Sequence, residues 1–170
     1  MNSEEFLNIV DNEDNIIGIE TRKKIDESGT KNYRVIHILI FSKDNKILLP
    51  IRSSSKSYCP NCYEFSVGGH VQASESYEKA TYRKLEEELN IKNVKLEEIK
   101  HFSPYELNIS SFTTLYKLVY DGLLKIAKNE IESVKYVSIN NLKDLIIKSP
   151  NKCTSDFVEI ISWLTKNNYI

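Results

Sequence analysis

The chain has 170 residues, of which 41% are hydrophobic and 28% charged, and its formal net charge is −1. This length is enough for one domain with its own core and short for two. So small a net charge gives no general attraction to nucleic acid or to an anionic membrane, and we expect neither as a partner. The longest apolar runs, such as residues 35–41, are only strand-length and contain His37, which argues against a segment that spans a bilayer.

The cysteines and the N-terminal sequence indicate a reducing compartment. The opening MNSEEFLN is acidic and lacks the basic and apolar regions of a secretory signal, so we expect a cytoplasmic protein. Three cysteines, an odd number, argue against a disulfide framework. Cys59 and Cys62 form a CxxC pair, a spacing that zinc sites and redox motifs share. No second pair supplies further zinc ligands and the pair does not open a helix, so we interpret these cysteines as incidental.

Strands dominate the first part of the chain. Segments rich in branched or aromatic residues predict strands at residues 6–10, 16–20, 33–42, 47–51 and 63–67. The first two flank the polar turn DNEDN and form a hairpin, and the third reads as a buried strand. The last of them delivers the chain to Gly68 and Gly69.

A charged helix follows the two glycines. Ser74 is the predicted N-cap, and the helix runs from about residue 75 to residue 89. Ala80, Leu85 and Leu89 share the face toward the core, which leaves the acidic positions near a wet cleft.

The rest of the chain alternates between strands and helices. We expect strands at residues 94–100, 112–120 and 133–137 and helices at residues 141–148 and 156–166. This order, with hairpins present, predicts an α/β fold of the α+β type, in which a mixed sheet lies between helices. We expect a single domain over residues 1–170, with an N-terminal hairpin extension at 1–32 and a core at 33–166.

The stretch GHVQASESYEKATYRKLEEELNI, residues 69–91, carries the clearest functional signal. Its spacing resembles the Nudix box, G-x5-E-x7-R-E-U-x-E-E-x-G-U, in which U is aliphatic. The residues on their expected positions are Gly69, Glu75, Arg83, Leu85, Glu87, Glu88 and Ile91. Lys84 replaces a glutamate of the pattern, and Asn90 replaces a glycine. Asparagine tolerates the left-handed conformation at a helix end, so Lys84 is the departure that bears on function.

The resemblance extends over about residues 33–163. The chain is similar to the Nudix subgroup related to isopentenyl-diphosphate isomerase, in which a strand ends in arginine, a lysine follows four residues later, and a proline-containing loop leads to a G-H turn. Those elements are here Arg52, Lys56, Pro60 and Gly69-His70. The resemblance implies a Nudix-like α/β/α sandwich.

Two activities occur in that subgroup. The isomerases shift a carbon–carbon double bond and share a cysteine beside the G-H turn and a metal site of three histidines and two glutamates. His37 and His70 lie where two of those histidines are expected. However, Gly68 takes the cysteine position and the third histidine position falls near Thr30. Residues 107–120 also hold no carboxylate. The resemblance therefore implies a hydrolase that cuts a diphosphate linked to another moiety, with the isomerase as the less favoured alternative.

Hydrolysis of a phosphoanhydride needs neutralised phosphates and an activated water, and divalent metal ions supply both. The resemblance implies Mg²⁺ or Mn²⁺ held by Glu87, Glu88 and the backbone carbonyl of Gly69. Arg83 lies four residues before Glu87 and can hold that carboxylate in one rotamer. Glu75 would cap or brace the loop at the helix N-terminus, where the helix dipole favours a carboxylate. A solvated charged helix without a site is the alternative interpretation.

Lys84 lies one helical turn from both Glu87 and Glu88 and shares their face. A lysine cannot bind Mg²⁺, but it can pair with Glu88 and present a positive charge to a phosphate. Three outcomes follow. The protein is a hydrolase that uses fewer metals, with Glu130 or Glu132 as the base; or it binds diphosphates without turnover; or the lysine is a substitution introduced to trap substrate.

Further residues are expected to contact a small-molecule diphosphate. Arg52 offers a bidentate fork to a distal phosphate and Lys56 a mobile charge, although both could be surface charges at a strand end. His70 follows the glycines and is expected as a phosphate contact or as a partner of one. His37 lies in an apolar strand and is interpreted as a core residue. A homodimer through the hairpin edge is left open.

Overall fold

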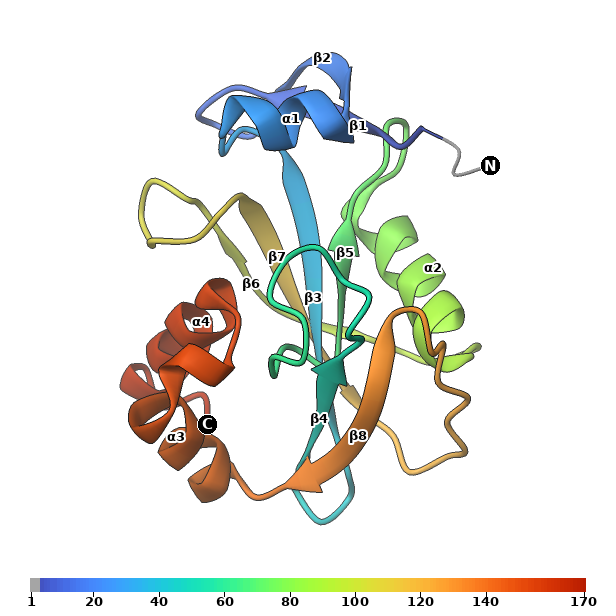
Figure 1. Cartoon of the computed structure of the whole chain (residues 1–170), viewed down its shortest axis with the longest axis vertical. Helices are drawn as coiled ribbons and strands as arrows, with labels where there is room; N and C mark the ends of the chain where they lie inside the picture. Colours follow the sequence, from blue (N-terminus) through green and yellow to red (C-terminus); the bar gives the residue numbers. More distant parts are fainter. Residues whose placement is uncertain (1–3) are drawn as a thin grey trace.

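The computed structural model describes residues 4–170, and a mixed sheet forms its centre (Figure 1). Its strands are β3 (Arg34–Phe41), β4 (Ile47–Arg52), β5 (Val67–His70), β6 (Glu97–Phe102), β7 (Phe112–Val119) and β8 (Ile131–Val137). The six-stranded sheet has the order β6-β7-β3-β4-β8, with β5 paired to β3 off this path. β3 is parallel to β7 and antiparallel to β4 and β5, which makes the sheet mixed, as predicted.

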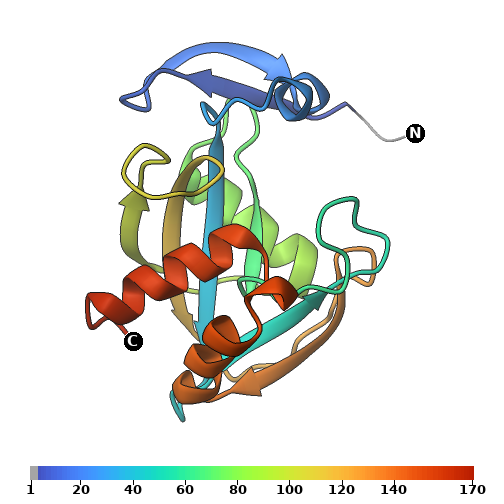
Figure 2. The same cartoon turned by 60° about the vertical axis from the view of Figure 1, so that its left-hand side comes forward.

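Helices cover both faces of the sheet (Figure 2). They are α2 (Tyr77–Leu89), α3 (Ile139–Lys148), the short 3₁₀ helix η1 (Pro150–Lys152) and α4 (Ser155–Lys166). Side chains of a strand alternate between faces, and β3 shows this clearly. Ile36, Ile38 and Ile40 pack in one buried cluster with α2, whereas Leu39 and Phe41 pack in the other with α3 and α4. This two-sided burial confirms the predicted sandwich. Over residues 4–170, no helix is both long and apolar enough to cross a membrane.

The predicted N-terminal hairpin is confirmed, and an unpredicted helix follows it. β1 (Phe6–Val10) and β2 (Ile16–Thr21) form a separate two-stranded sheet at one end of the central sheet (Figures 1 and 2). Thr21 caps α1 (Arg22–Ser28) by accepting a hydrogen bond from the backbone of Lys24 at 3.4 Å. Only Ile25 of this helix is buried, so the sequence offers no apolar period that would predict it.

The outer strand of the hairpin carries apolar side chains toward solvent. Ile16, Ile17 and Ile19 are 54%, 66% and 58% exposed. An exposed apolar edge can pair with another strand. Pairing of this edge with a second copy of the chain stays a prediction.

The strand predicted at residues 63–67 is wrong, because β5 begins at Val67 and includes both glycines. Tyr63 makes only isolated bridges, to Ile51 and to Cys153. A Cβ on Gly68 would lie 2.7 Å from Nδ1 of His37 on the neighbouring strand. The side chain of His37 therefore requires a glycine where β5 pairs with β3.

The predicted start of the box helix is also wrong. α2 begins at Tyr77, and its N-cap is Ser76, whose hydroxyl accepts from the backbone of Lys79 at 3.2 Å. Ser74 instead has a φ of 70°, so it belongs to the loop. At the other end, Asn90 takes the left-handed conformation with a φ of 55°, which confirms its predicted tolerance of that position. The later strands and helices lie where predicted, with small shifts at their ends.

Candidate active site

Arg83 ties the loop after β5 to α2. Its Nε and Nη2 donate to the two carboxylate oxygens of Glu75 at 2.7 and 2.8 Å. Nη2 also donates to the carbonyl of His70 at 3.0 Å, and Nη1 donates to Glu87 at 3.2 Å. Glu75 in turn accepts from the backbone of Gln72 at 3.0 Å. Glu75 is thus a brace of the loop and not a residue of the helix, and Arg83 orients Glu87.

The side chain of Lys84 lies between the glycine turn and the two glutamates. Its ammonium is 2.9 Å from Oε1 of Glu88 and 3.4 Å from Oε2 of Glu87. The stem of the lysine crosses Gly69, where a Cβ would lie 2.5 Å from Cε of Lys84. The lysine side chain is 13% exposed and that of Glu88 only 6%. The box therefore carries an ion pair where the family pattern has a third glutamate.

Burial and charge act in opposite directions on this pair. Burial raises the pKa of Glu88 to about 7, although the charge of Lys84 lowers it. Burial lowers the pKa of Lys84, but the charges of Glu88, Glu130 and Glu87 outweigh it and leave that pKa raised. The ammonium has two carboxylates within 4.0 Å and Glu88 has one cation, so the lysine stays charged and Glu88 is the easier group to neutralise.

Two further cations come from the end of β4 and the loop that follows. Arg52 forms an ion pair with Glu64, and their side chains are 14% and 18% exposed. Its Nε also donates to the carbonyl of Tyr58 at 3.1 Å. Lys56 forms an ion pair with Glu130, which lies in the loop before β8. Each cation thus already has a carboxylate partner.

These ion pairs share one electrostatic environment. Burial alone would raise the pKa of Glu130, but the hydrogen bond from Lys56 and the charges of Lys56, Lys84 and Arg52 lower it. Three of the four predicted phosphate contacts, Arg52, Lys56 and Lys84 but not His70, therefore lie within electrostatic reach of one carboxylate. Glu132, the other candidate base, is exposed, and its backbone carbonyl accepts from Lys128 at 2.7 Å.

The ion-paired residues Arg52, Lys56, Lys84, Glu64, Glu87, Glu88 and Glu130 form what we call the charged cluster. Glu64 is the member of this cluster that the sequence did not identify. Burial raises the pKa of its carboxyl group, whereas the charges of Arg52 and Lys56 lower it. The available signal was a lone carboxylate between two aromatic residues, Tyr63 and Phe65, just before the glycine turn. A charged residue in such an apolar setting needs a partner, and Arg52 provides it.

We expect Glu64→Gln to destabilise the protein by about 1–2 kcal/mol, because it leaves the guanidinium of Arg52 without its charged partner in a largely buried setting. Urea unfolding measures the difference. Glu132→Gln, which removes an exposed carboxylate nearby, should stay within about 0.5 kcal/mol of the wild type. Equal stability of the two variants would show that the Arg52–Glu64 pair contributes nothing.

The two histidines differ in their surroundings. His37 is partly buried, its ring stacks on Phe65 with centroids 3.9 Å apart, and its buried Nδ1 has no hydrogen-bond partner. Burial lowers its pKa to about 3, so His37 is a neutral core residue. The ring of His70 lies toward the hairpin, with Nδ1 4.0 Å from Glu5. Burial, with the charge of Arg22, lowers the pKa of His70 to about 4.

The interpretation of Cys59 and Cys62 as incidental is wrong, because they form a disulfide. The turn between them brings their Cα atoms to 5.5 Å, within the range that a disulfide bridges. Positive φ angles at Cys59 (44°) and Asn61 (61°) shape this turn. Cys153 is a buried free cysteine.

The residues present do not fit a resident divalent cation. Glu87 and Glu88, which the resemblance assigns to the metal, both contact the ammonium of Lys84, and a fixed positive charge repels a cation. Within residues 4–170, no three His, Cys, Asp or Glu side chains are arranged to hold a metal ion.

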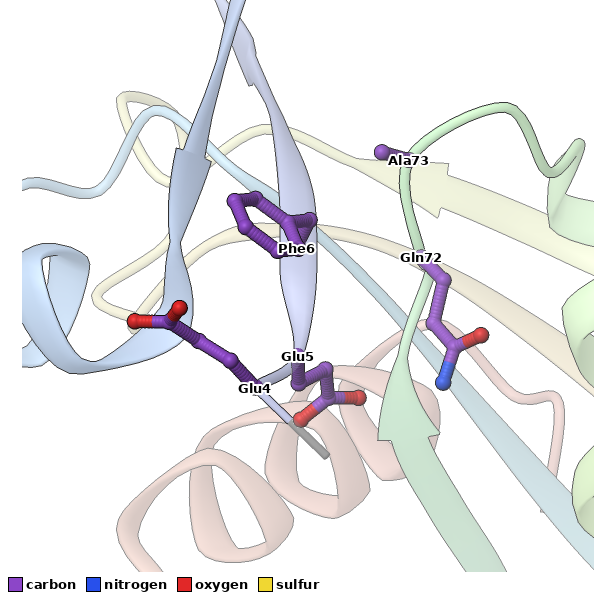
Figure 3. Close-up of a pocket in the computed structure, with 5 residues that line it drawn as sticks. All are labelled: Glu4, Glu5, Phe6, Gln72 and Ala73. Carbon is purple, nitrogen blue, oxygen red and sulfur yellow. The ribbon is translucent and has the colours of Figure 1, made fainter. Parts of the chain in front are cut away.

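A cavity of about 410 Å³ lies beside the box loop (Figure 3). Glu4, Glu5 and Phe6 line it from the start of β1, and Gln72 and Ala73 line it from the segment after β5. The cavity contains none of the predicted site residues. Two of its lining residues contact residues of the predicted site: Glu5 lies 4.0 Å from Nδ1 of His70, and the backbone N–H of Gln72 donates to Glu75 at 3.0 Å.

Comparison with known proteins places this geometry in a family. Residues 31–157 match the model of the NUDIX domain. An uncharacterized Nudix hydrolase of Nostoc is 37% identical over 119 residues, which cover 69% of this chain and 70% of that protein. A Serratia proteamaculans protein named isopentenyl-diphosphate Delta-isomerase is 29% identical over 169 residues, covering 96% of this chain and 93% of that protein. The crystal structure of DR0079 from Deinococcus radiodurans matches with a TM-score of 0.86 and 28% identity, covering 93% of this chain and 98% of that one. Since the domain match spans most of its length, the chain belongs to the Nudix hydrolase family.

Proposed function

We propose that this Nudix protein hydrolyses a compound in which a diphosphate is linked to another moiety, and that it takes this substrate as its Mg²⁺ or Mn²⁺ chelate. The observation that carries the proposal is the cluster of ion pairs. Arg52, Lys56 and Lys84 are each paired with a carboxylate of Glu64, Glu130 or Glu88, and Glu87 adds a further negative charge.

The charge balance explains why a chelate fits better than either ion alone. The carboxylates outnumber the cations, so a bare diphosphate meets no excess positive charge. A free cation meets the ammonium of Lys84. A chelate brings both charges at once, and the ion pairs can exchange partners. The phosphate oxygens of such a substrate would pair with Arg52, Lys56 and Lys84, and the carboxylates so released would be free to hold the substrate's own cation, since Mg²⁺ is commonly held by one or two carboxylates and the phosphates of its substrate.

Hydrolysis requires a base for the attacking water. Glu130 is ionised at neutral pH because the neighbouring cations lower its pKa. When Lys56 turns to a phosphate oxygen, the carboxylate of Glu130 is released to accept a proton from water. Attack of that water on phosphorus breaks the phosphoanhydride bond, and Arg52, Lys56 and Lys84 stabilise the charge on the departing phosphate.

Diphosphate binding without efficient turnover is the second candidate. It is favoured by the contacts of Lys84 with both box carboxylates. The isomerase activity named for the Serratia relative is not favoured. A side chain at Gly68, the position of the isomerase cysteine, would collide with the ring of His37.

A panel of nucleoside and isoprenoid diphosphates, each with Mg²⁺ or Mn²⁺, tests the proposal by phosphorus NMR. We expect release of a monophosphate from at least one compound. Glu130→Gln should slow it by about 10²-fold or more, because a general base contributes that much. Glu132→Gln should leave the rate unchanged. Calorimetric binding of the chelates without any product would select the second candidate, and neither binding nor product would refute both.

A further inference from the structure

The Cys59–Cys62 disulfide lies in the loop that holds Arg52. The backbone N–H of Arg52 donates to the carbonyl of Cys62 at 2.9 Å. The carbonyl of Arg52 accepts from Asn61 at 3.2 Å, and its Nε donates to the carbonyl of Tyr58 at 3.1 Å. Three hydrogen bonds thus join Arg52 to the turn that the disulfide closes (Asn61 and Cys62) or to the residue directly before it (Tyr58).

The backbone of this turn depends on the cross-link. Cys59 has a φ of 44°, in the left-handed region that residues with a Cβ rarely adopt. Such a conformation costs on the order of 1 kcal/mol or more and persists only where the surroundings enforce it. Here the disulfide and a backbone hydrogen bond from Cys62 to Cys59 at 3.3 Å close the turn, and Sγ of Cys59 also lies 3.9 Å from the carbonyl of Cys153. Tyr63 is anchored by bridges to Ile51 and Cys153, so the part of the turn that loses its covalent restraint on reduction is residues 58–61, which make two of the three contacts with Arg52.

The two sulfurs differ in access. Cys59 is partly exposed and stands between the exposed residues Tyr58 and Pro60, whereas Cys62 is 8% exposed. Cys59 is therefore the more accessible of the two residues to a thiol in solution. Cys153 is buried, and burial raises the pKa of its thiol to about 11, so it is not a competing nucleophile.

We propose that Cys59 and Cys62 form a redox-modification site, whose reactant is a dithiol, and that their oxidation state sets how firmly Arg52 is held for a phosphate. The second part rests on the proposed function, which gives Arg52 its phosphate. Disulfides of proteins in reducing compartments are mostly transient, as in redox sensors.

The exchange proceeds in two balanced steps. A thiolate of the dithiol attacks Sγ of Cys59, and Cys62 leaves as a thiolate that takes a proton. The second thiol of the reductant loses its proton and attacks the mixed disulfide, which releases the thiolate of Cys59, and this thiolate is protonated. The protein gains two thiols, and the reductant becomes a cyclic disulfide.

Hydrogen exchange and thiol titration test the redox site directly, with dithiothreitol as the dithiol. We expect one titratable thiol in the unfolded oxidised chain and three after reduction. On reduction, the amides of Arg52 and Asn61 should exchange at least about tenfold faster. The amide of Asn90, which bonds within the α2 cap, serves as the control and should not change. Unchanged exchange at Arg52 and Asn61 would overturn the proposal.

Calorimetry with magnesium pyrophosphate tests the consequence for the charged cluster. We expect about fivefold weaker binding after reduction, the same weakening in Cys59→Ser/Cys62→Ser without any redox response, and a full response in Cys153→Ser. Alkylation of the reduced wild type replaces the serine variant if that variant does not fold. Faster exchange with equal affinity in both states would overturn the link to Arg52. Faster exchange without binding in either state would remove the proposed function and uphold the redox site.

Discussion

Lys84→Glu is expected to make the stability of the protein depend on a divalent cation. The substitution removes an ammonium that pairs with Glu87 and Glu88 and adds a carboxylate beside them. In the presence of a chelator we expect a loss of about 3 kcal/mol, the usual cost of breaking a largely buried pair. Saturating Mn²⁺ at about one hundred times its Kd should restore about 2.7 kcal/mol, which raises Tm by roughly 5–10 °C. Thermal unfolding with and without Mn²⁺ measures both effects.

Matched variants separate the metal site from the change in charge. Lys79→Glu makes the same charge change on an exposed position of α2, so neither its Tm nor that of the wild type should respond to Mn²⁺. Lys84→Gln removes the ammonium without adding a ligand and should give a smaller response. Turnover of the chelated diphosphate separates the two candidate functions: it should fall in Lys84→Glu if Lys84 stabilises the departing phosphate, and rise at least about tenfold if the wild type binds diphosphates without efficient turnover. If Mn²⁺ alone stabilises the wild type as much as the variant, Lys84 does not exclude a resident metal.

The apolar patterns of the sequence predicted the central sheet because burial in the core requires apolar side chains at those positions. β3 contributes alternate side chains to two buried clusters, and a continuous run of branched apolar residues is typical of a strand that is buried on both faces. α1 escaped prediction for the opposite reason. It buries only Ile25, and local contacts hold it, such as the cap by Thr21 and the Arg22–Asp26 pair at 3.7 Å. Helices held by caps and surface pairs leave little periodic signal.

The residues of the charged cluster could be predicted, but not their pairing. The box spacing identified Arg83, Lys84, Glu87 and Glu88, since these positions lie on neighbouring helical turns. The partner of Arg52, Glu64, lies 12 residues further along the chain across an irregular loop, and only the fold brings Lys56 to Glu130, 74 residues away. The disulfide was missed because the CxxC spacing does not reveal the left-handed turn that allows it.

Lowering the pH from 7 to 4 is expected to destabilise the wild type by about 3 kcal/mol more than it destabilises His37→Phe. Burial lowers the pKa of His37 from 6.5 to about 3 in the folded protein. Between these values the unfolded chain binds a proton that the folded one does not, so stability rises with pH across this window and is lost as the pH falls. Urea unfolding at several pH values measures the slope for each variant.

The difference between the two proteins isolates this histidine. His70, whose pKa is lowered to about 4, and Glu88, whose pKa is raised to about 7, also titrate in this range, but they are present in both proteins. Phenylalanine keeps a ring on Phe65 and removes Nδ1, which has no hydrogen-bond partner, so no bond is lost near neutral pH. His37→Leu gives a second comparison if the larger ring overpacks the space beside Gly68. Parallel pH profiles in all three proteins would mean that His37 takes up its proton in the folded state as readily as in the unfolded chain.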